Sequence, residues 1–300
     1  MERRDRVILA TFATAALGLL AYGAYSESQT EKARGSSPAQ SLQASSPAPS
    51  LAAAPASASA APKAPRERVT ATELLNQTCS PAEEAACDCR LRATLSAFDR
   101  RAPEAALDIV QTSAEDCRKG ALMGLEAEAL ARNGKSEQAL AEAARILAVD
   151  PKNPYAAYAR GLSYQKTGQA TEAFSAAREA VKHGRGATAH VLVGLLEYRD
   201  KDFDEAEKAF EKALEVDPNS AEALFNLAVL NQRRNDYHKT REGYLRTLRV
   251  DPTHADALYN LAILTRGIGA TGEARHYTDK LSRVVGDDDP RVVRLRETLG

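Results

Sequence analysis

The chain has 300 residues, of which 44% are hydrophobic and 27% are charged. Its formal net charge of −1 argues against a protein that binds nucleic acid by neutralising phosphates, because that mode needs a strongly basic surface. Aromatic residues make up 5% of the chain and tryptophan is absent, as expected for alanine-rich helical stacks.

Residues 1–25 have the pattern of an export signal. Three arginines near the start precede Val7 to Tyr25, an uncharged, mostly apolar run of 19 residues. That length fits one bilayer crossing, and the arginines predict a cytoplasmic N-terminus with the rest of the chain outside. A cleaved signal peptide is the alternative, with Ala21-Tyr22-Gly23 as an acceptable cleavage site. We therefore expect a single-pass anchor in a bacterial inner membrane with the remainder in the periplasm, or secretion to the periplasm after cleavage.

Residues 26–69 are expected to form a disordered linker. They are rich in Ala, Pro and Ser, with six prolines between Pro38 and Pro65, and contain almost nothing that a folded core could bury. Order is expected to begin near Thr70.

Residues 70–119 are predicted to form an N-terminal capping hairpin that contains all four cysteines. Ser80-Pro81-Ala82-Glu83 has the pattern of a helix start, with Ser as N-cap, Pro in the first turn and Glu three residues later. The helix is expected to end near Phe98. A turn at Arg100 to Pro103 then leads into a second helix that ends near Thr112.

From residue 120 onward the same residue types return about every 34 residues, which is the mark of a repeat architecture. One column holds small residues: Ala127, Gly161, Gly194, Ala228 and Ala262. A second column holds Ala139, Ala173, Ala206, Thr240 and Ala274, and a third holds Ala143, Ala177, Phe210, Tyr244 and Thr278. Prolines end three repeats at Pro151, Pro218 and Pro252, whereas Arg185 stands where another would fall, in a repeat that is one residue short.

These columns resemble the tetratricopeptide repeat, a helix–turn–helix unit of 34 residues. The resemblance covers about Ala86 to Gly286, and the sequence departs from the pattern in lacking its tryptophan. It implies an all-α, right-handed solenoid of five to six helical hairpins, with the repeats in residues 120–286 and a capping helix in residues 287–300. Turns within the hairpins are expected at Asn133-Gly134, Thr167-Gly168, Asp200-Lys201, Asn235-Asp236 and Gly267-Ile268-Gly269.

The cysteines are expected to form disulfides, because an even number in an exported chain indicates oxidation. Cys89 lies early in the first helix of the opening hairpin and Cys117 lies just past its second helix, so Cys89–Cys117 is the preferred pair, leaving Cys79–Cys87. Sequence leaves the two other connectivities open. A thiol-redox or metal site on Cys87-Asp88-Cys89 is the functional alternative, although no histidine lies near.

No catalytic motif is recognisable. The five histidines are dispersed, and the sequence has no nucleophile elbow, phosphate loop or dinucleotide fingerprint. We therefore expect a protein that is not an enzyme, with no metal, cofactor or small-molecule substrate.

The resemblance implies that the first helix of each hairpin lines a concave, partner-binding face. The residues expected on that face are Tyr155, Tyr158, Leu195, Tyr198, Phe225, Asn226, Arg233, Tyr259, Asn260 and Arg266. Asn226 and Asn260, one repeat apart, are expected to hydrogen-bond to the backbone of an extended ligand, as such asparagines do in this family.

The expected function is a non-enzymatic, membrane-tethered scaffold that binds a protein or peptide partner in assembly of an envelope complex, without nucleic acid. One alternative is a chaperone-like handler of unfolded substrates, as in c-type cytochrome maturation. Another is a thiol-redox or metal module at the cysteines.

Overall fold

The computed structural model describes residues 69–80, 86–115 and 117–300, and this part of the chain is all-α, with helices α2 to α15 and no strand. The export signal and nearly all of the linker expected from the sequence lie outside it. Of the helices in the described residues, none has the length and apolar character that a membrane span needs.

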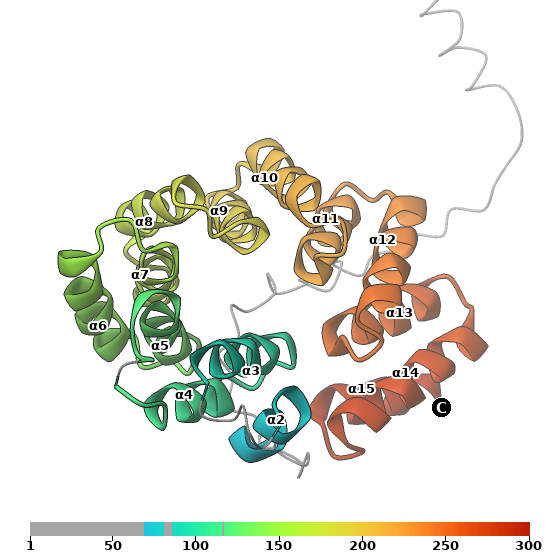
Figure 1. The fold of residues 1–300 in the computed structure, drawn as a ribbon. Helices are drawn as coiled ribbons and strands as arrows, with labels where there is room; N and C mark the ends of the chain where they lie inside the picture. Colours follow the sequence, from blue (N-terminus) through green and yellow to red (C-terminus); the bar gives the residue numbers. More distant parts are fainter. Residues whose placement is uncertain (1–68, 81–85, 116) are drawn as a thin grey trace, which may run out of the picture. The chain divides into compact units, whose positions relative to one another are not determined.

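Residues 120–285 form five antiparallel helical hairpins, which confirms the predicted repeats (Figure 1). The helices in chain order are α5 (Gly120–Arg132), α6 (Ser136–Val149), α7 (Pro154–Thr167), α8 (Ala170–Lys182), α9 (Ala187–Arg199), α10 (Phe203–Val216), α11 (Ala221–Arg233), α12 (Tyr237–Val250), α13 (Ala255–Gly267) and α14 (Thr271–Val285). Figure 1 shows the first helix of each hairpin on the inner side of the stack and the second on the outer side. The predicted C-terminal cap is α15 (Pro290–Leu299), whose Val292 and Leu295 are buried against the last hairpin.

Each hairpin turn falls where the sequence predicted it, and each contains one residue in the left-handed region. The φ values at these equivalent positions are 80° at Gly134, 81° at Gly168, 68° at Lys201, 58° at Asn235 and 80° at Gly269. A chain that reverses in three residues needs this conformation, which glycine and asparagine adopt at little cost and Lys201 adopts at a higher one. The turns are therefore a local property of the sequence.

The small-residue column is buried where neighbouring helices approach most closely. Gly194 lies against Phe210, and a Cβ atom placed on Gly194 would come within 2.5 Å of the Phe210 ring. Phe210 is fully buried among Val191, Ala206 and Leu230. The periodic columns thus reflect matched large and small side chains, and stability depends on stacking of neighbouring hairpins.

The N-terminal part has three helices, α2 (Ala71–Thr78), α3 (Cys87–Asp99) and α4 (Pro103–Gln111), in place of the expected two. The predicted helix start at Ser80 is wrong, because α3 follows Ala86 in extended conformation and begins at Cys87. A capping box forms earlier, in front of α2: the Thr70 hydroxyl accepts from the Glu73 N–H at 3.2 Å, and the Thr70 N–H donates to the Glu73 carboxylate at 2.8 Å. Residues 81–85 lie outside the described part.

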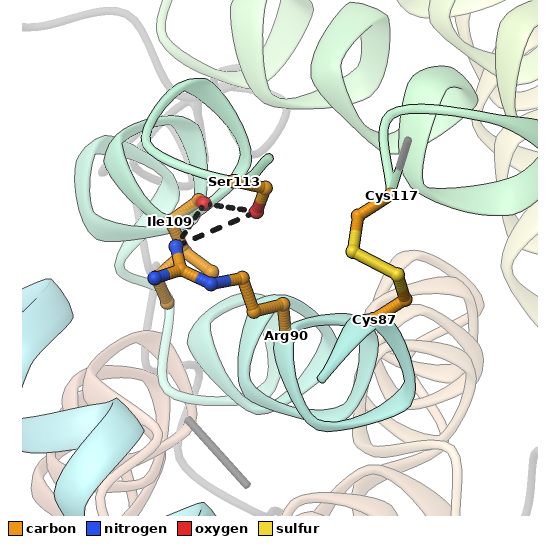
Figure 2. Close-up of a disulfide and its surroundings, with 5 residues drawn as sticks. All are labelled: Cys87, Arg90, Ile109, Ser113 and Cys117. Atoms are coloured by element: carbon orange, nitrogen blue, oxygen red, sulfur yellow. Dashed lines mark hydrogen bonds between the residues drawn. A yellow bond between two sulfur atoms is a disulfide. The ribbon is translucent and has the colours of Figure 1, made fainter. Parts of the chain in front are cut away.

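One disulfide joins Cys87 to Cys117 (Figure 2) and the other joins Cys79 to Cys89, with Cα–Cα distances of 5.0 Å and 5.8 Å, so the predicted pairing is wrong. Because α3 begins at Cys87, this residue occupies the helix end that faces the connector after α4. Cys89 is two residues further on, about 200° around the helix, and meets the C-terminal end of α2. The two disulfides therefore attach opposite sides of α3, one to the end of α2 and the other to the connector after α4.

A disulfide map of the full chain will find Cys87 linked to Cys117 and Cys79 linked to Cys89. Cleavage after Glu84 and before Asp88 under non-reducing conditions places Cys79, Cys87 and Cys89 on separate peptides, so mass spectrometry can assign each bridge independently. A reduced sample is the control. Recovery of a Cys89–Cys117 peptide, or of free thiols, contradicts the observed arrangement.

Candidate partner-binding surface

The first helices α7, α9, α11 and α13 lie on the inner side of the stack (Figure 1), and we call the side that they face there the inner surface. Its centre is a row of aliphatic side chains at equivalent positions of successive repeats: Leu162, Leu195, Val229 and Ile263. Each packs against a core cluster but remains partly exposed. The row gives the inner surface an apolar stripe that crosses four repeats.

Three predicted tyrosines flank the stripe and are also partly exposed: Tyr155, Tyr198 and Tyr259. The Tyr198 ring meets Phe203 edge-on at 5.5 Å between centroids. The exposed Arg233 guanidinium lies 4.4 Å from the Phe203 centroid and 5.6 Å from that of Tyr198. This stacking orients a cation at the edge of the surface.

Two other predicted contact residues are buried and so are unavailable to a partner. Tyr158 is 5% exposed because Arg132 and Arg185 cover its ring, and burial raises the pKa of its hydroxyl. Phe225 is also 5% exposed and stacks on His254 at 4.7 Å between ring centroids. Both are part of the packing between repeats.

The two asparagines that were expected to bind the backbone of a ligand differ in burial and in their hydrogen-bond partners. Asn260 is 9% exposed, and its side-chain amide donates to the Tyr244 hydroxyl at 3.0 Å. That hydroxyl in turn donates to the Gln232 amide oxygen, and burial raises the pKa of Tyr244. Asn226 remains partly exposed, while its amide donates to the Glu222 carbonyl of its own helix at 2.7 Å. Asn260 therefore satisfies a buried hydroxyl, and replacing it would disturb the core.

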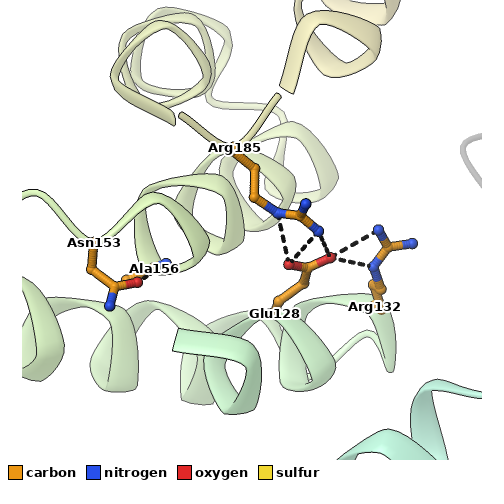
Figure 3. A network of polar contacts seen from close by, with 5 residues as sticks. All are labelled: Glu128, Arg132, Asn153, Ala156 and Arg185. Atoms are coloured by element: carbon orange, nitrogen blue, oxygen red, sulfur yellow. Dashed lines mark hydrogen bonds and ion pairs between the residues drawn. The ribbon is translucent and has the colours of Figure 1, made fainter. Parts of the chain in front are cut away.

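A buried ionic cluster lies at the N-terminal end of the repeats (Figure 3). The Glu128 carboxylate is fully buried and accepts from Arg132 at 2.9 Å and from Arg185 at 2.9 to 3.2 Å. Arg185 reaches back 57 residues in sequence to make this contact, and its guanidinium covers the Tyr155 and Tyr158 rings at 4.8 and 5.1 Å. The sequence marked Arg185 only as a departure from the repeat-ending proline.

The buried His254 is neutral in the folded chain. Its Nδ1 accepts from the Ala257 N–H at 3.3 Å and so caps α13. Burial, assisted by the nearby Arg101 charge, lowers the pKa of His254 to about 4. The imidazole therefore stabilises the start of a helix, and its buried position does not suggest that it binds a ligand.

An ion pair joins the turn after α3 to the loop before α13, with the Arg101 guanidinium 3.3 Å from the Asp251 carboxylate. Both side chains remain partly exposed, at 42% and 26%. Exposed pairs of this kind contribute at most about 1 kcal/mol, so this contact adds little to the stability of the fold.

Within the described residues, no group of three or more His, Cys, Asp and Glu side chains is arranged to hold a metal ion. The cysteines there are all in disulfides, so a dithiol is not present in this state.

Family models of the tetratricopeptide repeat match residues 125–190, 187–220 and 209–242. Residues 125–242 therefore contain tetratricopeptide repeats, which confirms the resemblance seen in the sequence. A comparison with curated protein sequences finds no match.

Solved structures with the same fold include pilF of Pseudomonas aeruginosa, at 19% identity and a TM-score of 0.52 over 72% of this chain and 99% of that one. The thermophilic repeat protein TTC0263 of Thermus thermophilus aligns at 19% identity and a TM-score of 0.49, over 57% of this chain and 95% of its own. YrrB, described as a repeat protein with an unusual peptide-binding site, aligns at 20% identity and a TM-score of 0.43, over 61% of this chain and 94% of its own. At these identities the likeness concerns the fold alone.

Proposed function

We propose that this protein is a non-enzymatic, membrane-tethered scaffold that binds a protein partner on its inner surface. The observation that carries the proposal is the aliphatic row of Leu162, Leu195, Val229 and Ile263, which remains partly exposed across four repeats. Tetratricopeptide stacks present extended surfaces of this kind to protein or peptide partners. A row of apolar side chains in contact with water favours burial against a second molecule.

The proposed location is the periplasmic side of a bacterial inner membrane, with Val7 to Tyr25 as the anchor. The uncharged run and the arginines before it support this topology. The two disulfides support it independently, because such bonds persist in oxidising compartments and are rare in the cytosol. A partner in an envelope complex would then meet repeats that are tethered by residues 26–69.

Site-specific photo-crosslinking of the full chain in its native cells tests the proposal. A photoreactive amino acid at Leu195 or Asn226 on the inner surface is expected to give one discrete adduct with another protein, recovered in the membrane fraction. The matched controls are Glu211 and Glu242, which are exposed on the outer helices α10 and α12.

Adducts of equal yield at inner and outer positions, or no adduct at any of them, contradict partner binding on the inner surface. An adduct that fractionates with soluble proteins contradicts the tether while leaving the binding surface in place.

A further inference from the structure

A second row of side chains runs beside the apolar stripe and is cationic. Lys166, Arg199 and Arg233 each follow the aliphatic residue of their helix by four positions, and Arg266 follows Ile263 by three. All four lie in the last turn of their helices. Since residues three and four apart lie on the same helix face, the cations border the stripe along one edge.

Intramolecular contacts hold three of these cations without neutralising them. Lys166 donates to the carbonyls of Ala131 and Arg132 at 2.6 and 3.3 Å, and Arg199 donates to the carbonyl of Gln165 at 3.1 Å. Arg233 lies over two aromatic rings. In the described part of the chain, none of the four forms an ion pair with a carboxylate. The row therefore presents uncompensated positive charge next to an apolar stripe.

The first member of the same column shows what complements such a cation. Arg132 precedes Lys166 by one repeat, and Glu128 precedes Leu162 by one repeat. Glu128 thus places a carboxylate in the stripe position, where Arg132 binds it at 2.9 Å (Figure 3). Arg132, the first cation of the column, is thus paired with a carboxylate of the chain itself, and the remaining four cations lack such a carboxylate.

The acidic residues of the inner surface lie at the opposite ends of these helices. Glu222 and Asp256 are each in the first turn, and Asp256 already pairs with Arg291 at 2.9 Å. Eleven residues separate Glu222 from Arg233, which is about 16 Å along the helix. The cationic edge is therefore spatially distinct from the acidic one.

The side-by-side arrangement of the two rows favours a helical ligand. In an α-helix, residues three, four and seven apart lie on one side, so an apolar stripe and an acidic edge can face the two rows together. In a strand, successive side chains point to opposite faces, which places such residues on two different sides.

We infer that the inner surface of α9, α11 and α13 binds an acidic amphipathic helix of the partner. Its aliphatic face packs on Leu195, Val229 and Ile263, and the carboxylates along one edge of that face meet Arg199, Arg233 and Arg266. This inference rests on the proposed function and adds the chemistry of the partner to it. Mixed apolar and ionic contact makes the interaction selective for acidic helices, because desolvated arginines without carboxylates are penalised.

Binding of capped synthetic helices to the full chain tests the inference. The probe is a peptide of about 20 residues, long enough at 1.5 Å per residue to cross three helices, with leucines on one face and Glu at every seventh position along its edge. Its companions carry Gln or Lys at the Glu positions, and a fourth contains proline and cannot form a helix. Fluorescence anisotropy gives each Kd.

The Glu helix is expected to bind at least tenfold more tightly than the Gln helix, with affinity that falls as salt is raised. Arg266→Gln should weaken it about twofold to fivefold, as expected for one exposed charge contact. That side chain makes no hydrogen bond or ion pair with the described residues, so its loss leaves the fold unchanged. The matched control is Arg246→Gln, in an exposed position on the outer helix α12, which should leave Kd unaltered.

Equal binding of the Glu, Gln and Lys helices, or of the proline peptide, overturns the inference, as does loss of affinity in both arginine variants alike. If no peptide binds while crosslinks still form at Leu195, the inference is wrong and the proposed function stands. If crosslinks fail as well, the proposed function is also wrong.

Discussion

Replacing Glu128 with Ala will lower the free energy of unfolding by about 3–5 kcal/mol, the range for breaking a buried ion pair from one side. The carboxylate is fully buried and is shared by Arg132 and Arg185, of which Arg185 is only 14% exposed. Without it, two guanidinium groups are held against Tyr158 with no carboxylate to accept their hydrogen bonds. Urea unfolding of the full chain, followed by circular dichroism, measures the change.

Two comparisons isolate the buried charge. Glu128→Gln keeps an acceptor oxygen and should fall between wild type and Ala. The control is Glu142→Ala, which removes a more exposed carboxylate three residues before Arg145 and should change stability by at most about 0.5 kcal/mol. A Glu128→Ala protein as stable as the Glu142→Ala protein would show that the cluster does not hold the repeats together.

Phe210→Ala will also lower the free energy of unfolding, by about 3–5 kcal/mol, because it empties a fully buried site between α9 and α10. The ring fills the space left by Gly194, so the two positions are coupled. Gly194→Ala alone overpacks this contact and should cost about 1–3 kcal/mol. In the Phe210→Ala background the same change should cost nothing or restore stability, since the added methyl enters the cavity.

Thermal and urea unfolding of the four proteins in this cycle give the coupling energy. Phe174→Ala is the control, because Phe174 occupies a partly exposed position on α8 and should lose less. Additive effects of Gly194→Ala and Phe210→Ala would mean that the periodic columns do not arise from direct packing of these side chains.

The hairpins and their turns could be predicted because their causes are local. The positions of Gly134, Gly168 and Asn235 mark the left-handed turn residues directly, and small residues such as Gly194 recur where helices meet. The start of α3 was misplaced, because this helix begins at Cys87 after Ala86 in extended conformation and not after Ser80. The capping box of this region forms at Thr70, in front of the additional helix α2.

The candidate surface was predicted only in part. The repeat register predicts on which face of a helix a residue lies, but it does not predict how deeply the side chain is buried. Tyr155, Leu195, Tyr198, Asn226, Arg233, Tyr259 and Arg266 do remain at least partly exposed. Tyr158, Phe225 and Asn260 occupy the same faces, yet neighbouring repeats cover them. The cationic row could have been found as a fourth periodic column at Lys166, Arg199 and Arg233.

By itself the sequence determined the repeat, its register, the hairpin turns and the capping helix, because each depends on residues within one 34-residue unit. Only the tertiary structure decided the pairing of Cys87 with Cys117 and the reach of Arg185 to Glu128, which lie 30 and 57 residues apart. Such contacts depend on where α3 begins and on how a shortened repeat places its connector. Those are properties of the packed chain, since a side chain finds a distant partner only after the helices between them have been stacked.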